Sequence, residues 1–268
     1  MPKISYYDDV KVVKKPLRKG VFSKLKIFLF FVLVIGCFWG AKHFSRALTV
    51  GNISNLIVFG DTKVKIKKSS LYAVTLGYYE SQSEAEGVAL GANIQGAGGY
   101  VWEDNGYYVI GNIYSSESDA QRVVDNLKDT KYNVGIKEII MPELKLNFDM
   151  YDNSDMDVIN KSLNIFDDVY RNLYDYSIKF DKGEISHLAV SSHVSEVRGN
   201  VKALIIEVQN LINKNSSSLN KVQTALVKLD EILDQTIIKT IDNSSTNYSL
   251  KYAISVVARI KYDLFNDL

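Results

Sequence analysis

The segment that decides the fold is Leu71-Tyr-Ala-Val-Thr-Leu-Gly-Tyr-Tyr79, together with its later counterpart Tyr107-Tyr-Val-Ile-Gly-Asn-Ile-Tyr114. Each is an alternating apolar run with a glycine near its end and an aromatic residue after it, which is typical of a half-buried strand. Each is followed by a Ser/Glu-rich stretch, Ser83-Glu-Ala-Glu86 or Ser116-Glu-Ser-Asp-Ala120, that favours the start of a helix. The repetition predicts two strand–helix units in tandem.

The residues between these units predict a hairpin. Tyr100-Val-Trp-Glu103 and Tyr107-Tyr-Val-Ile110 flank Asn105-Gly106, and Asn-Gly supplies the positive φ angles of a two-residue turn. A first helix is expected from Ser83 to Gln95, and Gly96, Gly98 and Gly99 are expected to end it. A second helix is expected from Ser116 to about Asp129, and a last strand from Tyr132 to Ile140. The resulting order, βαββαβ, predicts an α+β fold: a four-stranded antiparallel sheet with both helices on one face.

The faces of this sheet follow from the turn. A two-residue turn at Asn105-Gly106 pairs Asp104 with Tyr107 and Trp102 with Val109, and side chains alternate along a strand. This sets Val74, Leu76, Val101, Tyr108 and Ile110 under the helices, and Thr75, Tyr100, Trp102, Tyr107 and Val109 on the open face. A domain this small buries only about 60% of its chain surface, so an aromatic open face suggests ligand binding. The alternative is that the linker or the carboxyl-terminal half covers it.

This pattern resembles the SPOR family of bacterial envelope domains. The family's first-strand motif usually reads Val-Gln-Val-Gly-Ser-Phe, and Val74-Thr-Leu-Gly-Tyr-Tyr79 has the same frame, with Thr75 and Tyr78 where the glycan-contacting residues often stand. Tyr107 replaces an Arg before the third-strand motif, and Gly111-Asn112 replaces Gly-Pro. The resemblance implies binding of denuded septal peptidoglycan strands on the sheet face. The implied glycan-binding residues are Thr75, Tyr78, Tyr100, Trp102, Tyr107 and Val109.

The amino-terminal part predicts membrane attachment. Residues 1–26 form a basic tail with eight Lys or Arg and two Asp. Residues 27–41 are uncharged and mostly apolar. Residues 27–44 are expected to be a single transmembrane helix in the cell membrane, with the tail cytoplasmic and everything later extracytoplasmic. A cleaved signal peptide and a lipoprotein site at Val34-Ile-Gly-Cys37 are the alternatives. The membrane lipid bilayer is therefore an expected partner.

The rest of the chain divides into a linker (45–69), a SPOR-like domain (70–142), a second linker (143–155) and a helical bundle (156–268). Apolar residues at helical spacing predict four bundle helices. The first is expected from a cap at Ser154 or Asp155 to Lys182, and the second from about Glu184 to Asn213. Apolar positions from Leu219 to Leu233 mark the third, and those from Leu250 to Leu264 mark the fourth. Short polar links favour an antiparallel bundle. A dimeric coiled coil is the alternative.

The sequence carries no pattern of catalysis. His187 and His193 are six residues apart and lie on different helix faces, so they make a poor metal pair, and no Ser/His/Asp, Cys/His or phosphate-loop motif occurs. We therefore expect no enzyme activity, no cofactor and no metal. A net charge of +1 argues against nucleic-acid binding.

Together these features predict a non-catalytic, single-pass membrane protein whose external SPOR-like domain binds peptidoglycan during cell division or sporulation. Division or sporulation proteins are expected to bind the bundle. The alternative is a membrane-anchored scaffold in which a degenerate SPOR-like domain and the bundle bind protein partners. That alternative would be favoured if Thr75, Trp102 and Tyr107 were closed to solvent.

Overall fold

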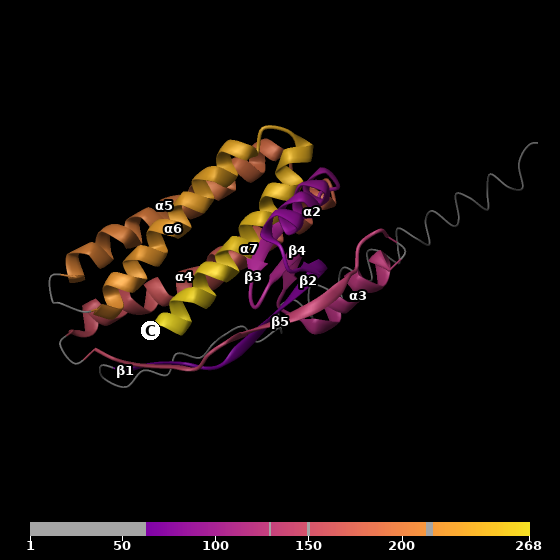
Figure 1. Cartoon of the computed structure of the whole chain (residues 1–268). Helices are drawn as coiled ribbons and strands as arrows, with labels where there is room; N and C mark the ends of the chain where they lie inside the picture. Colours follow the sequence, from indigo (N-terminus) through magenta and orange to yellow (C-terminus); the bar gives the residue numbers. More distant parts are fainter. Residues whose placement is uncertain (1–62, 129, 149–150, 213–216) are drawn as a thin grey trace, which may run out of the picture. The chain divides into compact units, whose positions relative to one another are not determined.

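The computed structural model describes residues 63–128, 130–148, 151–212 and 217–268, which all belong to one compact unit. The strands are β1 (Lys63–Ile66), β2 (Ser69–Tyr79), β3 (Tyr100–Glu103), β4 (Tyr107–Tyr114), β5 (Gly135–Met141) and β6 (Leu144–Asn147) (Figure 1). The helices are α2 (Gln82–Ile94), α3 (Glu117–Leu127), α4 (Asn153–Asp181), α5 (His187–Ile212), α6 (Ser217–Lys239) and α7 (Asn243–Asp267).

The predicted fold class, taken as a whole, is wrong and needs three corrections. Within the described ranges no helix is both long and apolar enough to cross a membrane, and the helix predicted at 27–44 lies outside those ranges. The described strands form two sheets instead of one. Finally, the main sheet has no open face, because the bundle packs against the side opposite α2 and α3.

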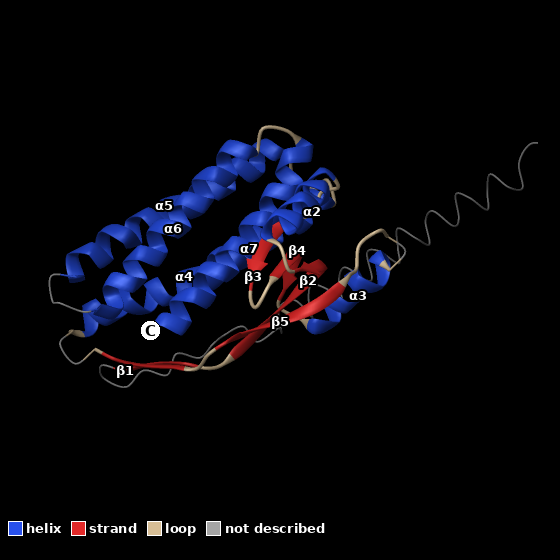
Figure 2. Cartoon of the chain, viewed as in Figure 1, coloured by secondary structure: helices blue, strands red, loops and turns tan. Residues whose placement is uncertain are grey.

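The main sheet is antiparallel, with strand order β3-β4-β2-β5. On one face, Leu76 packs with α2 and Val74 packs with α3, as the alternation in the first strand predicts. On the other face, α7 lies against β4, β3 and β5. Figure 2 shows the strands between these helices, so the sheet is the middle layer of three.

The small sheet continues the main one. Strands β1 and β6 pair with the same register as β2 and β5, and only residues 67–68 and 142–143 interrupt the ladder. The aligned pairs include Lys63 with Asn147, Ile66 with Leu144, Ser69 with Met141 and Thr75 with Gly135. We call residues 63–75 with 135–147 the long ribbon. Its outer part, which the sequence analysis assigned to linkers, extends beyond the main sheet and lies along the bundle (Figure 1).

Alternation explains why the outer ribbon forms. In Lys63-Val-Lys-Ile66 the two apolar side chains are buried and the two lysines are exposed, and Leu144 and Phe148 are buried beside them. These apolar side chains belong to the same core as the bundle helices. The ribbon therefore gains its stability from the helices it covers, since an isolated two-stranded ribbon is marginal in water.

Helices α4 to α7 form the bundle. The first begins with a capping box in which the Asp152 side chain accepts hydrogen bonds from the backbone of Ser154 and Asp155, and Asp155 bonds back to the cap. The cap thus lies two or three residues before the positions that the sequence suggested. Heptad positions such as Leu219 and Leu226 in α6 are fully buried, as their 3-4 spacing predicts.

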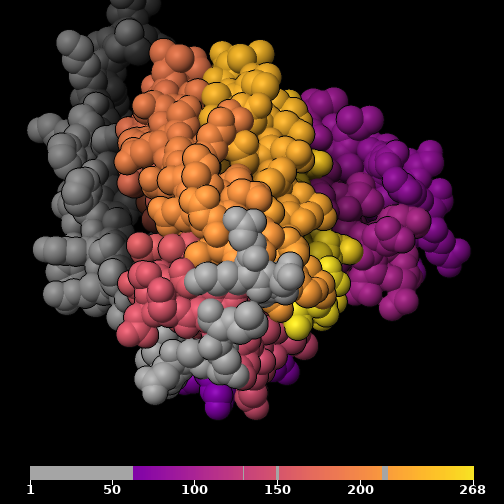
Figure 3. Space-filling view, turned by 90° about the vertical axis from the view of Figure 1, so that its left-hand side faces the viewer, coloured from indigo at the N-terminus to yellow at the C-terminus, as the bar shows by residue number. Residues whose placement is uncertain are grey.

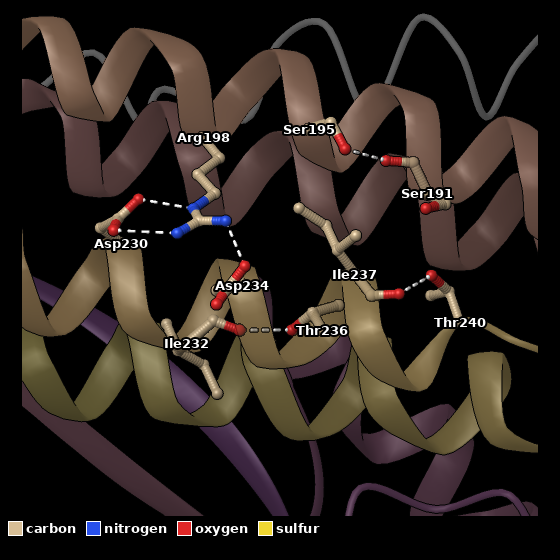
Figure 4. A network of polar contacts seen from close by, with 9 residues as sticks. All are labelled: Ser191, Ser195, Arg198, Asp230, Ile232, Asp234, Thr236, Ile237 and Thr240. Carbon is tan, nitrogen blue, oxygen red and sulfur yellow. Dashed lines mark hydrogen bonds and ion pairs between the residues drawn. The ribbon is translucent and has the colours of Figure 1, made fainter.

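An arginine on α5 bridges two turns of α6. Nε of Arg198 lies 2.7 Å from Oδ1 of Asp230, its Nη2 lies 3.2 Å from Oδ2, and its Nη1 contacts Asp234 (Figure 4). The hydroxyls of Thr236 and Thr240 donate to the carbonyls of Ile232 and Ile237 within α6. The guanidinium fork fixes the register of α5 against α6.

Sheet and bundle share one hydrophobic core. It runs from Ala73, Trp102 and Ile113 in the sheet to Phe166 and Leu229 in the bundle, all of them buried. The space-filling view shows the elements of the sheet region, in purple and magenta, directly against the yellow α7 (Figure 3). The bundle is therefore not self-contained, because some of its core comes from the sheet.

Candidate functional site

The hairpin that was expected to display the binding residues has a different register. Glu103 pairs with Tyr107 and Trp102 pairs with Tyr108, so the loop contains three residues, Asp104 to Gly106. Asn105 has a φ of 49° and Gly106 a φ of 133°, so both adopt positive angles, as an Asn-Gly pair can. The turn lies where the sequence predicts it, but it is one residue longer.

A one-residue slip moves a strand's side chains to the other face. Tyr107 and Val109 therefore lie on the α2 side, beside Val101, and Tyr108 and Ile110 lie on the bundle side. For these four residues the predicted faces are wrong. Tyr100 and Trp102 do lie on the side away from α2, as expected, although that side is not open.

Helix α7 covers the face that was expected to bind glycan. The Trp102 ring is 2% exposed and packs edge-on against Tyr262, with ring centroids 5.5 Å apart. The guanidinium of Arg259 lies 5.0 Å from the same ring centroid and donates to the Glu103 carbonyl at 2.9 Å. Thr75 is buried as well. The central residues of the predicted surface are thus held inside the protein.

Tyr100 lies at the border of the covered face. Its ring is 5.6 Å from that of Tyr252 on α7, in an edge-to-face arrangement. Burial raises the pKa of Tyr100 to about 12; the positive charge of Arg259 acts against this, and Tyr252 and Asp263 add to it. The phenol therefore stays neutral at physiological pH and can donate a hydrogen bond.

Tyr78 is separate from this packing. It is 48% exposed, its hydroxyl donates to the Asn105 carbonyl at 2.8 Å, and its ring lies 5.0 Å from that of Tyr108. The Lys137 ammonium lies 4.3 Å from the centroid of the Tyr108 ring. Tyr78 thus braces the hairpin loop while one side of its ring meets solvent.

Two of the six predicted residues line an open groove at the edge of the sheet. The groove has a volume of about 430 Å³ and lies between α2, β3 and α7. Its walls include Tyr100, Tyr107 and Tyr252, with the carboxylates of Glu86 and Glu103. This size falls within the range of pockets that hold small ligands. We call it the β3 groove.

The charged groups of the β3 groove are the carboxylates of Glu86 and Glu103, which accept hydrogen bonds. Oδ1 of Asn93 is buried and has no hydrogen-bond partner among the described residues, and no Lys or Arg of those residues lines the walls. Leu90, which is 67% exposed, adds an apolar side chain at the rim. Such walls suit a ligand that carries hydrogen-bond donors and a face that can stack on a tyrosine ring.

Sequence reasoning missed the contributions of α2 and α7 to this groove. A local signal for the close approach of α7 exists at Gly98: a Cβ there would lie 2.9 Å from the Lys251 carbonyl carbon on α7 and 3.0 Å from the Gly111 oxygen. Gly98 thus lets the backbones of α7 and β4 come together. Its presence after a helix suggested only the helix end.

The histidines lie in separate places. Nδ1 of His187 is 3.3 Å from the Asn243 side-chain oxygen, and His193 stacks on Tyr176 with centroids 4.8 Å apart. Over the stretches of chain that the structure describes, no group of three His, Cys, Asp or Glu side chains lies close enough to hold a metal ion.

Comparison of the chain with models of protein families, with curated proteins and with solved structures gave no match in any of the three.

Proposed function

We propose that the chain is a non-catalytic scaffold whose SPOR-like sheet holds its own helical bundle and whose bundle binds protein partners. The observation that carries this proposal is the burial of Trp102 under Arg259 and Tyr262 of α7. Packing against a helix of the same chain is by itself a reason for this sheet face to be aromatic. Glycan binding is not required to explain the aromatic residues.

The energetic cost of uncovering this face supports the same proposal. Large side chains from the sheet that join the bundle core include Trp102, Ile110, Ile113, Ile139 and Met141. Exposing one such side chain costs about 1.5–3 kcal/mol, so exposing five costs about 8–15 kcal/mol. That equals the whole stability of a typical domain. A ligand would have to provide this much before it could reach the face.

Exposed apolar side chains on the bundle give a partner something to bind. Leu188 and Ile206 on α5 and Ile238 on α6 are each at least 65% exposed. These side chains are the contacts that we propose a partner would use. The bundle can therefore offer contacts that do not compete with its attachment to the sheet.

A second candidate function is glycan binding in the β3 groove. The observation that favours it is the meeting of Tyr100, Tyr107 and Tyr252 with two carboxylates around one open groove. Sugar rings stack on aromatic faces, and their hydroxyls donate to carboxylates. Here two predicted glycan residues, Tyr100 and Tyr107, would act at the sheet edge instead of on its face.

One experiment separates the two functions. The full chain is mixed with purified cell walls, before and after amidase treatment, and the pelleted fraction is measured. The scaffold proposal expects no pelleting above a non-binding control protein in either case. Pelleting that requires amidase treatment, and that falls in a Glu86→Gln/Tyr107→Phe variant, would favour the groove. Tyr78→Phe, which leaves the groove walls unchanged, is the matched control.

A further inference from the structure

The outer part of the long ribbon carries a concentrated positive charge. Residues 63–68 and 142–147 contain five lysines and one carboxylate, a formal charge of +4 in a chain whose total is +1. We call Lys63, Lys65, Lys67, Lys68 and Lys145 the lysine strip. All five side chains are exposed. The apolar side chains of β1 and β6 face the core, so Lys63, Lys65 and Lys145 lie on the outward side. Lys67 and Lys68 follow in the exposed break between β1 and β2.

The ladder brings lysines of the strip close together. Lys65 and Lys145 are directly opposite each other on neighbouring strands, and their side chains are 50% and 70% exposed. Like charges in such a cross-strand pair destabilise a ribbon. Glu143 lies 3.2 Å from one ammonium and 3.5 Å from the other, and relieves only some of the repulsion. The arrangement favours an external anion.

The spacing allows the strip to act as one unit. Alternate residues along a strand, such as Lys63 and Lys65, are about 6.6 Å apart. This is less than the Debye length of about 8 Å at physiological ionic strength, so the charges of neighbouring lysines act together. The hydrogen bond from Lys65, and then the charge of Lys145, lower the pKa of Glu143, which keeps this carboxyl ionised. The positive charge therefore exceeds the local negative charge at any physiological pH.

We propose that the lysine strip binds the surface of an anionic lipid bilayer. Its groups are ammonium ions, which act as point charges without the bidentate geometry of arginine. The five residues of the strip carry no aromatic ring, and none of them lines the β3 groove. An array of ammonium ions along the outer side of a ribbon fits a plane of headgroups better than a single polymer strand.

The test uses the full chain and a readout that is local to each lysine. The protein is treated with a reductive methylation reagent in the presence of phosphatidylcholine vesicles, with or without phosphatidylglycerol. Mass spectrometry then gives the methylation rate of each lysine. The internal controls are two exposed lysines, Lys128 at the C-cap of α3 and Lys202 on α5. Because the rates are read residue by residue, binding through another basic segment does not imitate the result.

A lysine near an anionic surface contributes about a fivefold increase in binding. We expect the methylation of Lys65 and Lys145 to slow by at least about fivefold when phosphatidylglycerol is added. The control lysines should change by less than about twofold. In a Lys65→Gln/Lys145→Gln variant, which keeps the ribbon and removes its like-charge pair, the protection of Lys63 should fall.

Three results would overturn the proposal. One is equal methylation rates with and without phosphatidylglycerol. Another is protection that survives unchanged at Lys63 in the Lys65→Gln/Lys145→Gln variant. The last is protection by soluble polyphosphate at the same phosphate concentration that matches or exceeds protection by the vesicles, because it would assign the strip to a soluble polyanion. The proposal does not depend on the scaffold function.

Discussion

Nζ of Lys261 on α7 lies 2.6 Å from Oδ1 of Asp167 on α4, and the two side chains are only 5% and 15% exposed. A buried ion pair has already lost its hydration, so removal of one member leaves an uncompensated charge. We expect Asp167→Asn to lower the free energy of unfolding by about 3–5 kcal/mol. Urea denaturation of the purified chain measures it.

Replacement of both members tests the same contact in the other direction. The variant Asp167→Leu/Lys261→Met should be within about 1 kcal/mol of the original stability, because both charges leave together. The control is Asp168→Asn, which breaks the exposed pair with Arg171 one turn away. A large loss of stability in that control would show that α4 is destabilised by any loss of charge in this turn, whether or not the buried pair is affected.

Truncation of Trp102 should unfold the junction between sheet and bundle. Trp102→Ala removes a ring that is 2% exposed, and such changes cost about 3–5 kcal/mol. Thermal unfolding followed by circular dichroism should show a lower Tm. Tyr78→Ala, at a residue that is 48% exposed, should cost about 0.5–1.5 kcal/mol through its single hydrogen bond. Equal effects of the two variants would contradict the covered face.

Glycine substitutions separate close packing from helix propensity. Gly98→Ala sets a Cβ against the backbone of Lys251 and should cost about 1–3 kcal/mol. Gly87→Ala, in α2, meets nothing within 4 Å and should gain about 0.5–1 kcal/mol. Denaturation midpoints of the two variants should therefore move in opposite directions. Movement in the same direction would argue against the close approach of α7.

The Arg198 bridge should depend on its two-pronged geometry. Arg198→Lys keeps the charge but loses the fork that reaches both Asp230 and Asp234, so we expect a loss of about 1 kcal/mol at low salt. A double-mutant cycle with Asp230→Asn gives the coupling energy. Arg171 pairs with Asp168 within the same helix, and both side chains are exposed. The loss of stability in Arg171→Lys should therefore stay below about 0.5 kcal/mol. No difference between the two would refute the bridge.

Alkaline pH should unfold the junction. Burial raises the pKa of Tyr100 from 10.0 to about 12, and it also raises the pKa values of Tyr114, Tyr170 and Tyr252. Above pH 10 the unfolded chain releases these protons and the folded chain does not, so the unfolded state binds fewer protons and stability falls as pH rises. Urea midpoints measured from pH 8 upward should drop beyond pH 10. The tyrosinate absorbance of these four residues should appear together with unfolding.

Local pattern alone predicts the alternation of the first strand. The alternation from Leu71 to Tyr78 assigns Val74 and Leu76 to the sheet face that the helices cover. Leu76 does pack with α2, and Val74 packs with α3. The 3-4 spacing in α6 likewise predicts its buried side. These inferences succeed because burial on one face imposes a period on the sequence.

The hairpin register needed more than local pattern. Asn105-Gly106 supports a two-residue turn, and it equally supports the three-residue loop in which Glu103 pairs with Tyr107. In either hairpin, β3 and β4 would place aromatic and apolar side chains on both faces of the sheet. The sequence alone therefore does not distinguish the two registers. The packing of Ile110 into the bundle core selects between them, and that packing is distant in the chain.

The covering of the sheet is a long-range feature of the same kind. Lys261 occupies an apolar position of the α7 repeat, where its ion pair with Asp167 and its place over the Phe265 ring account for a charge. Sequence periodicity shows that a helix side is buried, but it does not show what buries it. The aromatic sheet face and the bundle each predicted a partner, and in this structure each is the partner of the other.

The long ribbon has a mechanical consequence. Because Lys63 and Asn147 are paired neighbours, the chain enters and leaves the sheet region at the same end of one antiparallel ladder. Tension applied between the segment before Lys63 and the bundle would load this ladder like a zipper, so its hydrogen bonds would break in sequence, pair after pair, from Lys63 inward. The ribbon would then yield at low force as a weak link, while the sheet beyond Ser69 remained unloaded until the last outer pair had opened.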